Sequence, residues 1–170
     1  MEGKRPLVDG NDIPVLGLGA FRRDSEEATV EVVRKFLSLT AVQSMKHIEI
    51  SELFGNGLII LNAINDYGVK REDIFLTYKV WPKDRSGADI IESVTDSLSL
   101  IQLSHFDLVL IHAPIDTKKK FDQWSALEVL KDQGLTKSIG VSCYSEMQLV
   151  ELMKFCQLQP SVLQVSKTII

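Results

Sequence analysis

The segment His47-Ile-Glu-Ile-Ser-Glu-Leu-Phe-Gly-Asn56 contains the pattern that decides the fold. Its first half belongs to a β-branched run over residues 46–51, which predicts a strand. Gly55-Asn56 marks a turn, and the apolar stretch 57–67 that follows it predicts a helix. A strand, a turn and a helix in succession form half of a βαβ unit, so the segment indicates a parallel sheet covered by helices.

The same succession recurs on both sides of this segment. A first helix is expected over residues 25–40, with Asp24 as its cap and Glu27 at the spacing of a capping box. Asp9-Gly10 between apolar residues predicts a small hairpin ahead of the first core strand. The expected strands cover residues 15–20, 46–51, 74–78, 106–112, 138–142 and 161–165. The later helices are marked by apolar stripes that contain Ile90, Val94 and Leu98, then Phe121, Trp124 and Leu127, then Leu149 and Leu152.

Composition limits the class of protein. A chain of 170 residues with 45% apolar and 25% charged residues fits one soluble globular domain or part of a larger one. A net charge of −4 argues against a nucleic-acid or anionic-membrane partner, and the lysine run 118–120 is interpreted as a solvated helix start. The apolar stretch 58–64 is far shorter than the roughly 20 residues that span a bilayer. Two cysteines without a secretory leader pattern favour reduced thiols and a cytoplasmic location.

Six strands joined by five helices fit either an open doubly wound sheet or an unfinished barrel, and periodicity does not separate them. Five segments carry a resemblance that does: residues 8–19, residues 47–56, Leu76-Thr-Tyr-Lys-Val-Trp-Pro82, Leu110-Ile-His-Ala-Pro114 and Gly134-Leu-Thr-Lys-Ser-Ile-Gly-Val-Ser142. Through them the chain resembles the aldo-keto reductases. The resemblance implies an α/β fold of the (β/α)8 TIM-barrel family, without a Rossmann loop. Residues 1–170 are then expected to form a single partial barrel domain of about six parallel strands after an N-terminal β-hairpin.

The expected barrel is incomplete, because a full one takes about 250 residues or more. The resemblance assigns two further strands, and the loop that holds the adenine and 2′-phosphate of NADPH, to a segment after strand six. The chain is therefore expected to be truncated after that strand. Its first and sixth core strands would be open edges, which favour self-association.

The family activity is hydride transfer from NADPH to an aldehyde or ketone, with a tyrosine phenol as proton donor. A lysine held by a carboxylate lowers the pKa of that phenol, and a histidine orients the carbonyl. By resemblance, the lysine is Lys79, the histidine is His112 and the carboxylate is Glu49. The tyrosine position is Phe54, a degenerate proton-donor position.

A phenyl ring has no exchangeable proton, so we expect roughly 10²–10⁴-fold slower catalysis unless another acid acts. His112 is one substitute, donating near pH 6 to 7, and Glu52 is another if its loop turns inward. The structural alternatives are a solvated strand-end Lys79, a hydrogen-bonded core histidine at position 112, and an apolar filler at Phe54.

The resemblance assigns nicotinamide contacts to Ser142, Cys143 and Gln164, where Cys143 replaces an asparagine and weakens the cofactor grip. Alternatively, Cys143 is a small buried hydrophobe. Trp81 is either a wall of the substrate pocket or a cover for the barrel mouth. Trp124 is expected in the core. His47 is expected to be structural, and no metal site is expected.

Two classes of function follow. The first is an NADPH-dependent carbonyl reductase, acting on a small carbonyl substrate, with impaired or lost activity and weak or absent NADPH binding. The second is a non-catalytic homologue that acts as a regulatory or interaction subunit. A third possibility is an incomplete gene product. The joint departures at Phe54, Glu49 and Cys143 favour a degenerate site.

Overall fold

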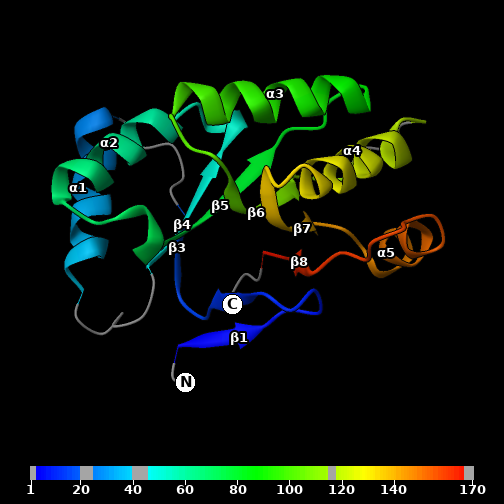
Figure 1. The fold of residues 1–170 in the computed structure, drawn as a ribbon, viewed down its shortest axis with the longest axis horizontal. Helices are drawn as coiled ribbons and strands as arrows, with labels where there is room; N and C mark the ends of the chain where they lie inside the picture. Colours follow the sequence, from blue (N-terminus) through cyan, green and yellow to red (C-terminus); the bar gives the residue numbers. More distant parts are fainter. Residues whose placement is uncertain (1–2, 20–24, 40–45, 115–117, 167–170) are drawn as a thin grey trace.

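The computed structural model describes residues 3–19, 25–39, 46–114 and 118–166. An antiparallel hairpin of β1 (Lys4–Pro6) and β2 (Asp12–Pro14) precedes a parallel sheet of six strands (Figure 1). In that sheet each strand pairs with the next along the chain, in the order β3 (Gly17–Gly19), β4 (Lys46–Ser51), β5 (Ile74–Val80), β6 (Phe106–Ile111), β7 (Thr136–Ser142) and β8 (Val162–Gln164). A doubly wound sheet reverses its strand order at a switch point, so the consecutive order is that of a barrel wall.

The sheet curls. β4 and β8 are four places apart in the strand order, a separation of roughly 19 Å in a flat sheet. Yet the side-chain amide of Gln164 on β8 donates to the carboxylate of Glu49 on β4 at 2.7 Å. The six strands therefore form an arc whose two ends approach each other, and the barrel expectation is confirmed.

Among the described residues, five α-helices connect the strands and lie on the convex side of the arc, while the hairpin lies on the other side, near β3 and β8 (Figure 1). The connection of each parallel strand to the next through a helix explains this one-sided cover. The helices are α1 (Glu26–Ser38), α2 (Gly57–Tyr67), α3 (Gly87–Leu100), α4 (Lys120–Asp132) and α5 (Glu146–Met153). None of the helices in the described part of the chain has the length and apolar character needed to cross a bilayer.

Most expected boundaries lie within two residues of those observed. The bounds of β4 and α2 are those predicted. Helix α1 is capped by Ser25, whose hydroxyl accepts from the Ala28 N–H, whereas Asp24 lies outside the described residues, as do Ala20 and Thr40 at the ends of their expected elements. β3 begins at Gly17 and not at Val15, because the Val15 N–H bonds to the Gly3 carbonyl in continuation of the hairpin.

The hairpin is present, with residues 7–11 as its loop. The Leu7 N–H donates to Asn11 O at 2.7 Å, and Gly10 takes a positive φ of 86°. Asp9 forms an ion pair with Lys131 on α4 at 2.7 Å, which ties the loop to the helix layer. Burial acts to raise the pKa of Asp9, but hydrogen bonds from Lys131 and from serine side chains outweigh it and lower the pKa to about 2.

The apolar core has two parts. The larger part fills the space between the helices and the convex face of the sheet and includes Trp124, whose exposure of 1% confirms its predicted place in the core. The smaller part lies on the concave face, where Phe75, Leu108 and Leu110 pack with Ile13 of the hairpin and with Val162. The hairpin therefore covers apolar side chains inside the arc.

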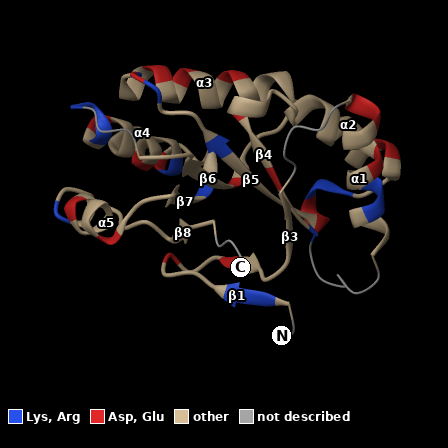
Figure 2. Ribbon diagram, turned by 180° about the vertical axis from the view of Figure 1, so that it is seen from behind, with Lys and Arg blue, Asp and Glu red and all other residues tan. Residues whose placement is uncertain are grey.

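Charged residues lie mainly on the helices and the hairpin (Figure 2). Asp89, Glu92 and Asp96 recur along α3, and Lys4 and Arg5 lie on β1. The lysine run 118–120 leads into α4, where Lys120 pairs with Glu151 at 2.8 Å. The last of these lysines is therefore the first residue of α4, and its acidic partner lies on α5.

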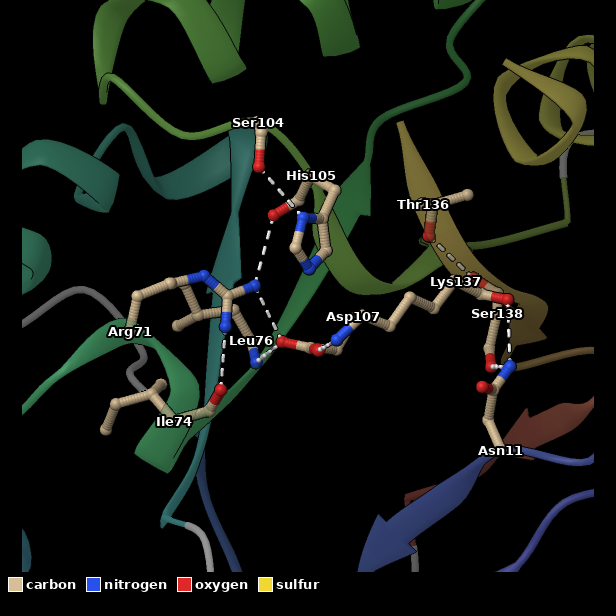
Figure 3. A network of polar contacts seen from close by, with 10 residues as sticks. All are labelled: Asn11, Arg71, Ile74, Leu76, Ser104, His105, Asp107, Thr136, Lys137 and Ser138. Carbon is tan, nitrogen blue, oxygen red and sulfur yellow. Dashed lines mark hydrogen bonds and ion pairs between the residues drawn. The ribbon is translucent and has the colours of Figure 1, made fainter. Parts of the chain in front are cut away.

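The buried carboxylate of Asp107, only 3% exposed, joins three neighbouring strands near their amino ends (Figure 3). It accepts from Arg71 at 2.7 Å, from the Leu76 N–H at 2.9 Å and from Lys137 at 2.8 Å. Arg71 also donates to the carbonyls of Ile74 and His105. Burial acts to raise the pKa of Asp107, but Lys137, the Leu76 N–H and Arg71 outweigh it and hold the pKa below its usual value.

We predict that Asp107→Ala lowers the free energy of unfolding by about 2–3 kcal/mol, because charged hydrogen bonds to three partners are lost at once. In the parent protein, the lowered pKa contributes stability that is present above about pH 4 and lost as the pH falls below it, so the difference between the two proteins should shrink in acid. Urea unfolding at pH 7 and at pH 3 measures both effects.

The matched control is Asp66→Ala, since Asp66 makes an exposed ion pair with Arg34 at 3.8 Å. It should leave the urea midpoint unchanged. Equal destabilisation by the two variants would contradict a special role for Asp107.

Candidate active site

The carboxyl ends of β4, β5 and β6 bring the expected catalytic residues together. Glu49 lies near the end of β4, Lys79 near the end of β5, and His112 directly after β6. Ser51 pairs with Lys79 in the sheet register, and the His112 N–H donates to Val80 O at 3.0 Å. Because the strands are parallel, these ends share one edge of the sheet, the edge at which barrel enzymes carry their active sites.

Lys79 and Glu49 form the electrostatic centre of this edge. Lys79 Nζ lies 2.9 Å from Glu49 Oε1, and the two side chains are only 11% and 16% exposed. Glu49 Oε2 accepts the hydrogen bond from Gln164 at 2.7 Å. The alternative of a solvated strand-end lysine is therefore wrong, because Lys79 is buried. Its paired carboxylate offsets the cost of burying the ammonium.

His112 is held by three side chains. Its Nδ1 lies 3.0 Å from Ser51 Oγ. The Trp81 and Phe54 rings meet it edge-on, with ring centroids at 5.3 Å and 5.9 Å. The imidazole is half-buried in this cage, between an aromatic pair and a hydroxyl.

Burial lowers the pKa of His112, the positive charge of Lys79 lowers it further, and Glu49 opposes this in part. An ordinary histidine has a pKa near 6.5, so His112 is mostly neutral at pH 7. The imidazolium is thus a minor species at neutral pH. This weakens the expectation that His112 substitutes as the acid near pH 6 to 7.

Phe54 ends the short 3-10 helix η1 (Glu52–Phe54), which stops at Gly55 in the left-handed conformation with a φ of 60°. Its ring occupies the position that the resemblance gives to a phenol and meets the His112 ring in a T-shaped contact. An apolar ring therefore lies beside the histidine where the resemblance places a proton donor.

Glu52 is not turned toward His112. Its carboxylate accepts from the Trp81 N–H at 2.7 Å, from Arg85 at 2.7 Å and from Ser93 at 2.6 Å. These three donors fix the carboxylate on the side of α3. Glu52 therefore anchors the loop that carries Trp81, and the expectation that it serves as a substitute acid is not supported.

The residues expected to hold nicotinamide lie at the ends of β7 and β8. Ser142 is buried, and its hydroxyl lies 3.6 Å from Cys143 Sγ. The Cys143 N–H donates to Gln164 O at 2.8 Å, so the two strand ends are in register. Gln164 Oε1 is buried without a partner, while the amide nitrogen binds Glu49.

Cys143 is exposed, so the alternative of a small buried hydrophobe is wrong. Its φ of 61° lies in the left-handed region, which costs roughly 1–2 kcal/mol for most residues and which asparagine adopts more readily. A thiol also lacks the paired donor and acceptor of an amide. Relative to the asparagine that the resemblance places here, cysteine is thus less suited to this backbone conformation.

Ser51 was missed by sequence reasoning, although a signal was present. Residues 47, 49 and 51 of a strand point to the same face, so Ser51 shares the face of Glu49.

His47 lies on that face as well. Its ring bonds to Thr77 Oγ1 at 2.8 Å and packs on Phe75 at 4.9 Å, contacts that support its predicted structural role.

A cavity of about 490 Å³ lies on the concave side between β3 and β8, and Glu49 and Gln164 line its polar part. Apolar side chains such as Leu18 and Val162 line the remainder. Within the described residues, no cluster of three or more His, Cys, Asp or Glu side chains has the arrangement of a metal site.

Comparison with known proteins supplies the family. Residues 15–170 match the model of the Aldo/keto reductase family. The chain is 33% identical to the uncharacterized oxidoreductase YtbE of Bacillus subtilis, covering 97% of this chain and 59% of that protein. It is also 33% identical to glyoxal reductase of the same organism, covering 94% and 56%. The chain thus spans about half the length of the curated relatives it matches.

Solved structures agree. An aldo/keto reductase from Brucella melitensis superposes with a TM-score of 0.86 at 33% identity, covering 96% of this chain and 62% of that one. A Bombyx mori aldo-keto reductase in complex with NADP gives a TM-score of 0.83 at 26% identity, covering 96% and 58%. Both similarities extend over nearly all of the chain.

Proposed function

Since this chain belongs to the aldo-keto reductase family, we propose that its strand-end site is an NADPH-dependent carbonyl-reductase site with strongly impaired turnover. Two similar proteins support this proposal: one is named a glyoxal reductase, and the other, an aldo-keto reductase, was solved in complex with NADP. The proposal depends on one observation, the Phe54 ring that faces His112 where a phenol would donate a proton.

The nicotinamide end of the cofactor fits the residues present. Gln164 Oε1, buried without a partner, is an acceptor that suits the amide N–H of a carboxamide. Ser142 adds a hydroxyl at the neighbouring strand end, and Cys143 adds only a weak donor. When bound, NADPH supplies the hydride. Of these three residues, Cys143 offers the weakest hydrogen bond to the nicotinamide amide.

The remaining residues orient a carbonyl substrate. His112 is placed to donate to a carbonyl oxygen, and the Trp81 ring beside it forms a wall for a small carbonyl compound. Lys79, fixed by Glu49, supplies positive charge that stabilises negative charge on the oxygen. The missing step is proton delivery, since Phe54 has no proton to give. This loss is worth roughly 10²–10⁴-fold in rate.

We predict that the 170-residue chain binds NADPH weakly or not at all, with a Kd above the low-micromolar range in a fluorescence titration. Cys143→Asn should tighten binding, because an amide supplies a paired donor and acceptor and tolerates the left-handed backbone. Cys143→Ala, which offers no polar group, is the matched control and should not tighten binding. A low-micromolar or tighter Kd for the parent chain would contradict the prediction.

We further predict that Phe54→Tyr alone does not produce robust turnover of a simple aromatic aldehyde with NADPH, because cofactor binding stays limiting. Phe54→Leu, which also lacks a hydroxyl, is the control and should match the parent. Loss of NADPH absorbance at 340 nm measures the rate. Clear turnover by Phe54→Tyr would mean that the cofactor grip is adequate, and clear turnover by the parent would refute the impaired site itself.

A second candidate function, association with a protein partner or a second copy, is favoured by the two end strands. β3 and β8 each have one unpaired edge among the described strands, and apolar side chains at or beside them are exposed. These are Val15, Leu16, Leu163 and Val165, at 59%, 53%, 41% and 61%. Unpaired backbone groups next to exposed apolar side chains template strand addition.

For the 170-residue chain we therefore predict concentration-dependent self-association in size-exclusion chromatography with light scattering. Leu163→Lys should reduce it, because a charge on an edge strand opposes pairing. Met147→Lys is the matched control, since Met147 is an exposed apolar residue on α5 that lies away from the edge strands. A stable monomer at all concentrations would exclude association through these edges.

A further inference from the structure

We propose that Ser51 is a positioning residue. Its hydroxyl donates to His112 Nδ1 and so keeps the ring proton on Nε2, from which the ring can donate a hydrogen bond to a carbonyl oxygen. The inference rests on the proposed function, in that His112 is taken to meet the substrate carbonyl. It adds a residue to which the family resemblance gave no role.

The backbone fixes the hydroxyl. Ser51 is the last residue of β4, is 3% exposed and is paired in register with Lys79. Its Oγ lies 3.0 Å from Nδ1, within hydrogen-bond distance for a hydroxyl and an imidazole nitrogen. The serine therefore meets one defined nitrogen of the ring from a rigid element.

The ring is fixed as well. The Trp81 and Phe54 rings contact it edge-on. Trp81 is in turn held through its N–H by Glu52, whose carboxylate is clamped by Arg85 and Ser93. With Nδ1 directed at Ser51, Nε2 is the nitrogen that remains for a ligand.

The direction of the hydrogen bond follows from what the ring must do. A neutral imidazole has one donor and one acceptor nitrogen. If the serine proton points to Nδ1, the ring proton lies on Nε2 and can be donated to a carbonyl oxygen. In the reverse arrangement Nε2 would present a lone pair to the lone pairs of that oxygen, which is repulsive. Only the first arrangement gives a neutral histidine that polarises a carbonyl.

The charged groups that face the ring are Lys79 on β5 and Glu49 on β4. Burial and Lys79 lower the pKa of His112, so the neutral ring is the species that a ligand meets at pH 7. The tautomer of that neutral ring then decides whether it donates or accepts. A hydroxyl at Nδ1 is a means of selecting it without a further charge.

The test is NMR of the full 170-residue chain labelled with ¹⁵N-histidine, which reports the tautomer and the pKa of each ring without cofactor or substrate. The parent should show His112 with its proton on Nε2 above its pKa. Ser51→Ala should move the tautomer signals toward a mixture of the Nε2–H and Nδ1–H forms, because the hydroxyl that selects the Nε2–H form is lost.

Two further variants sharpen the result. Ser51→Cys keeps nearly the same volume with a weaker donor, so its shifts should lie between those of parent and Ser51→Ala. Ser138→Ala removes another buried hydroxyl, one that bonds Asn11, and should leave His112 unchanged. A parent ring with its proton on Nδ1, or unchanged His112 signals in Ser51→Ala, would overturn the proposal. Because no turnover is measured, this outcome is independent of whether the site reduces carbonyls.

Discussion

The pairing of a buried ammonium with a partly buried carboxylate is the interaction on which the site depends. Lys79 lies inside the carboxyl edge of the sheet, where an unpaired charge would be very costly, and Glu49 supplies the compensating charge at 2.9 Å. The second oxygen of Glu49 reaches Gln164 on the last strand. The extra methylene of glutamate, relative to the family's aspartate, is therefore accommodated by a carboxylate that serves two partners, and His112 lies within the field of both charges.

The two ends of the strands have different tasks. At the amino end, Asp107 joins β5, β6 and β7, and the hairpin loop is tied to α4 through Asp9 and Lys131. At the carboxyl end lie the side chains suited to chemistry. In barrels of this kind the amino end commonly carries stability and the carboxyl end carries function, and the placement of these side chains is compatible with that division. Phe54 and Cys143, which depart from the family resemblance, lie at the carboxyl end, whereas both carboxylate oxygens of Asp107 at the amino end are hydrogen-bonded.

Much of the fold could be predicted from the sequence, because β-branched runs and helical stripes repeat along it. The bounds of β4 and α2 were predicted correctly, and the small differences elsewhere arise where a backbone group finds another partner, as Val15 does. The choice of barrel over doubly wound sheet came from family resemblance, since curvature is a property of many strands together. The convergence of Glu49, Lys79 and His112 followed from their places at strand ends. The directions of Glu52 and Cys143 did not, because they depend on a side-chain rotamer and on a left-handed residue that no spacing encodes.

The hydrogen bond between Gln164 and Glu49 spans the hollow of the arc, and its mechanical consequence concerns curvature. Ladder hydrogen bonds along a wall set the distance between neighbouring strands but permit the wall to bend more or less. A contact between strands four places apart joins two distant parts of the curved sheet, and it limits how far the sheet can flatten. The same two side chains line the cavity, so one contact both restrains the curvature of the sheet and contributes polar atoms to the space inside it.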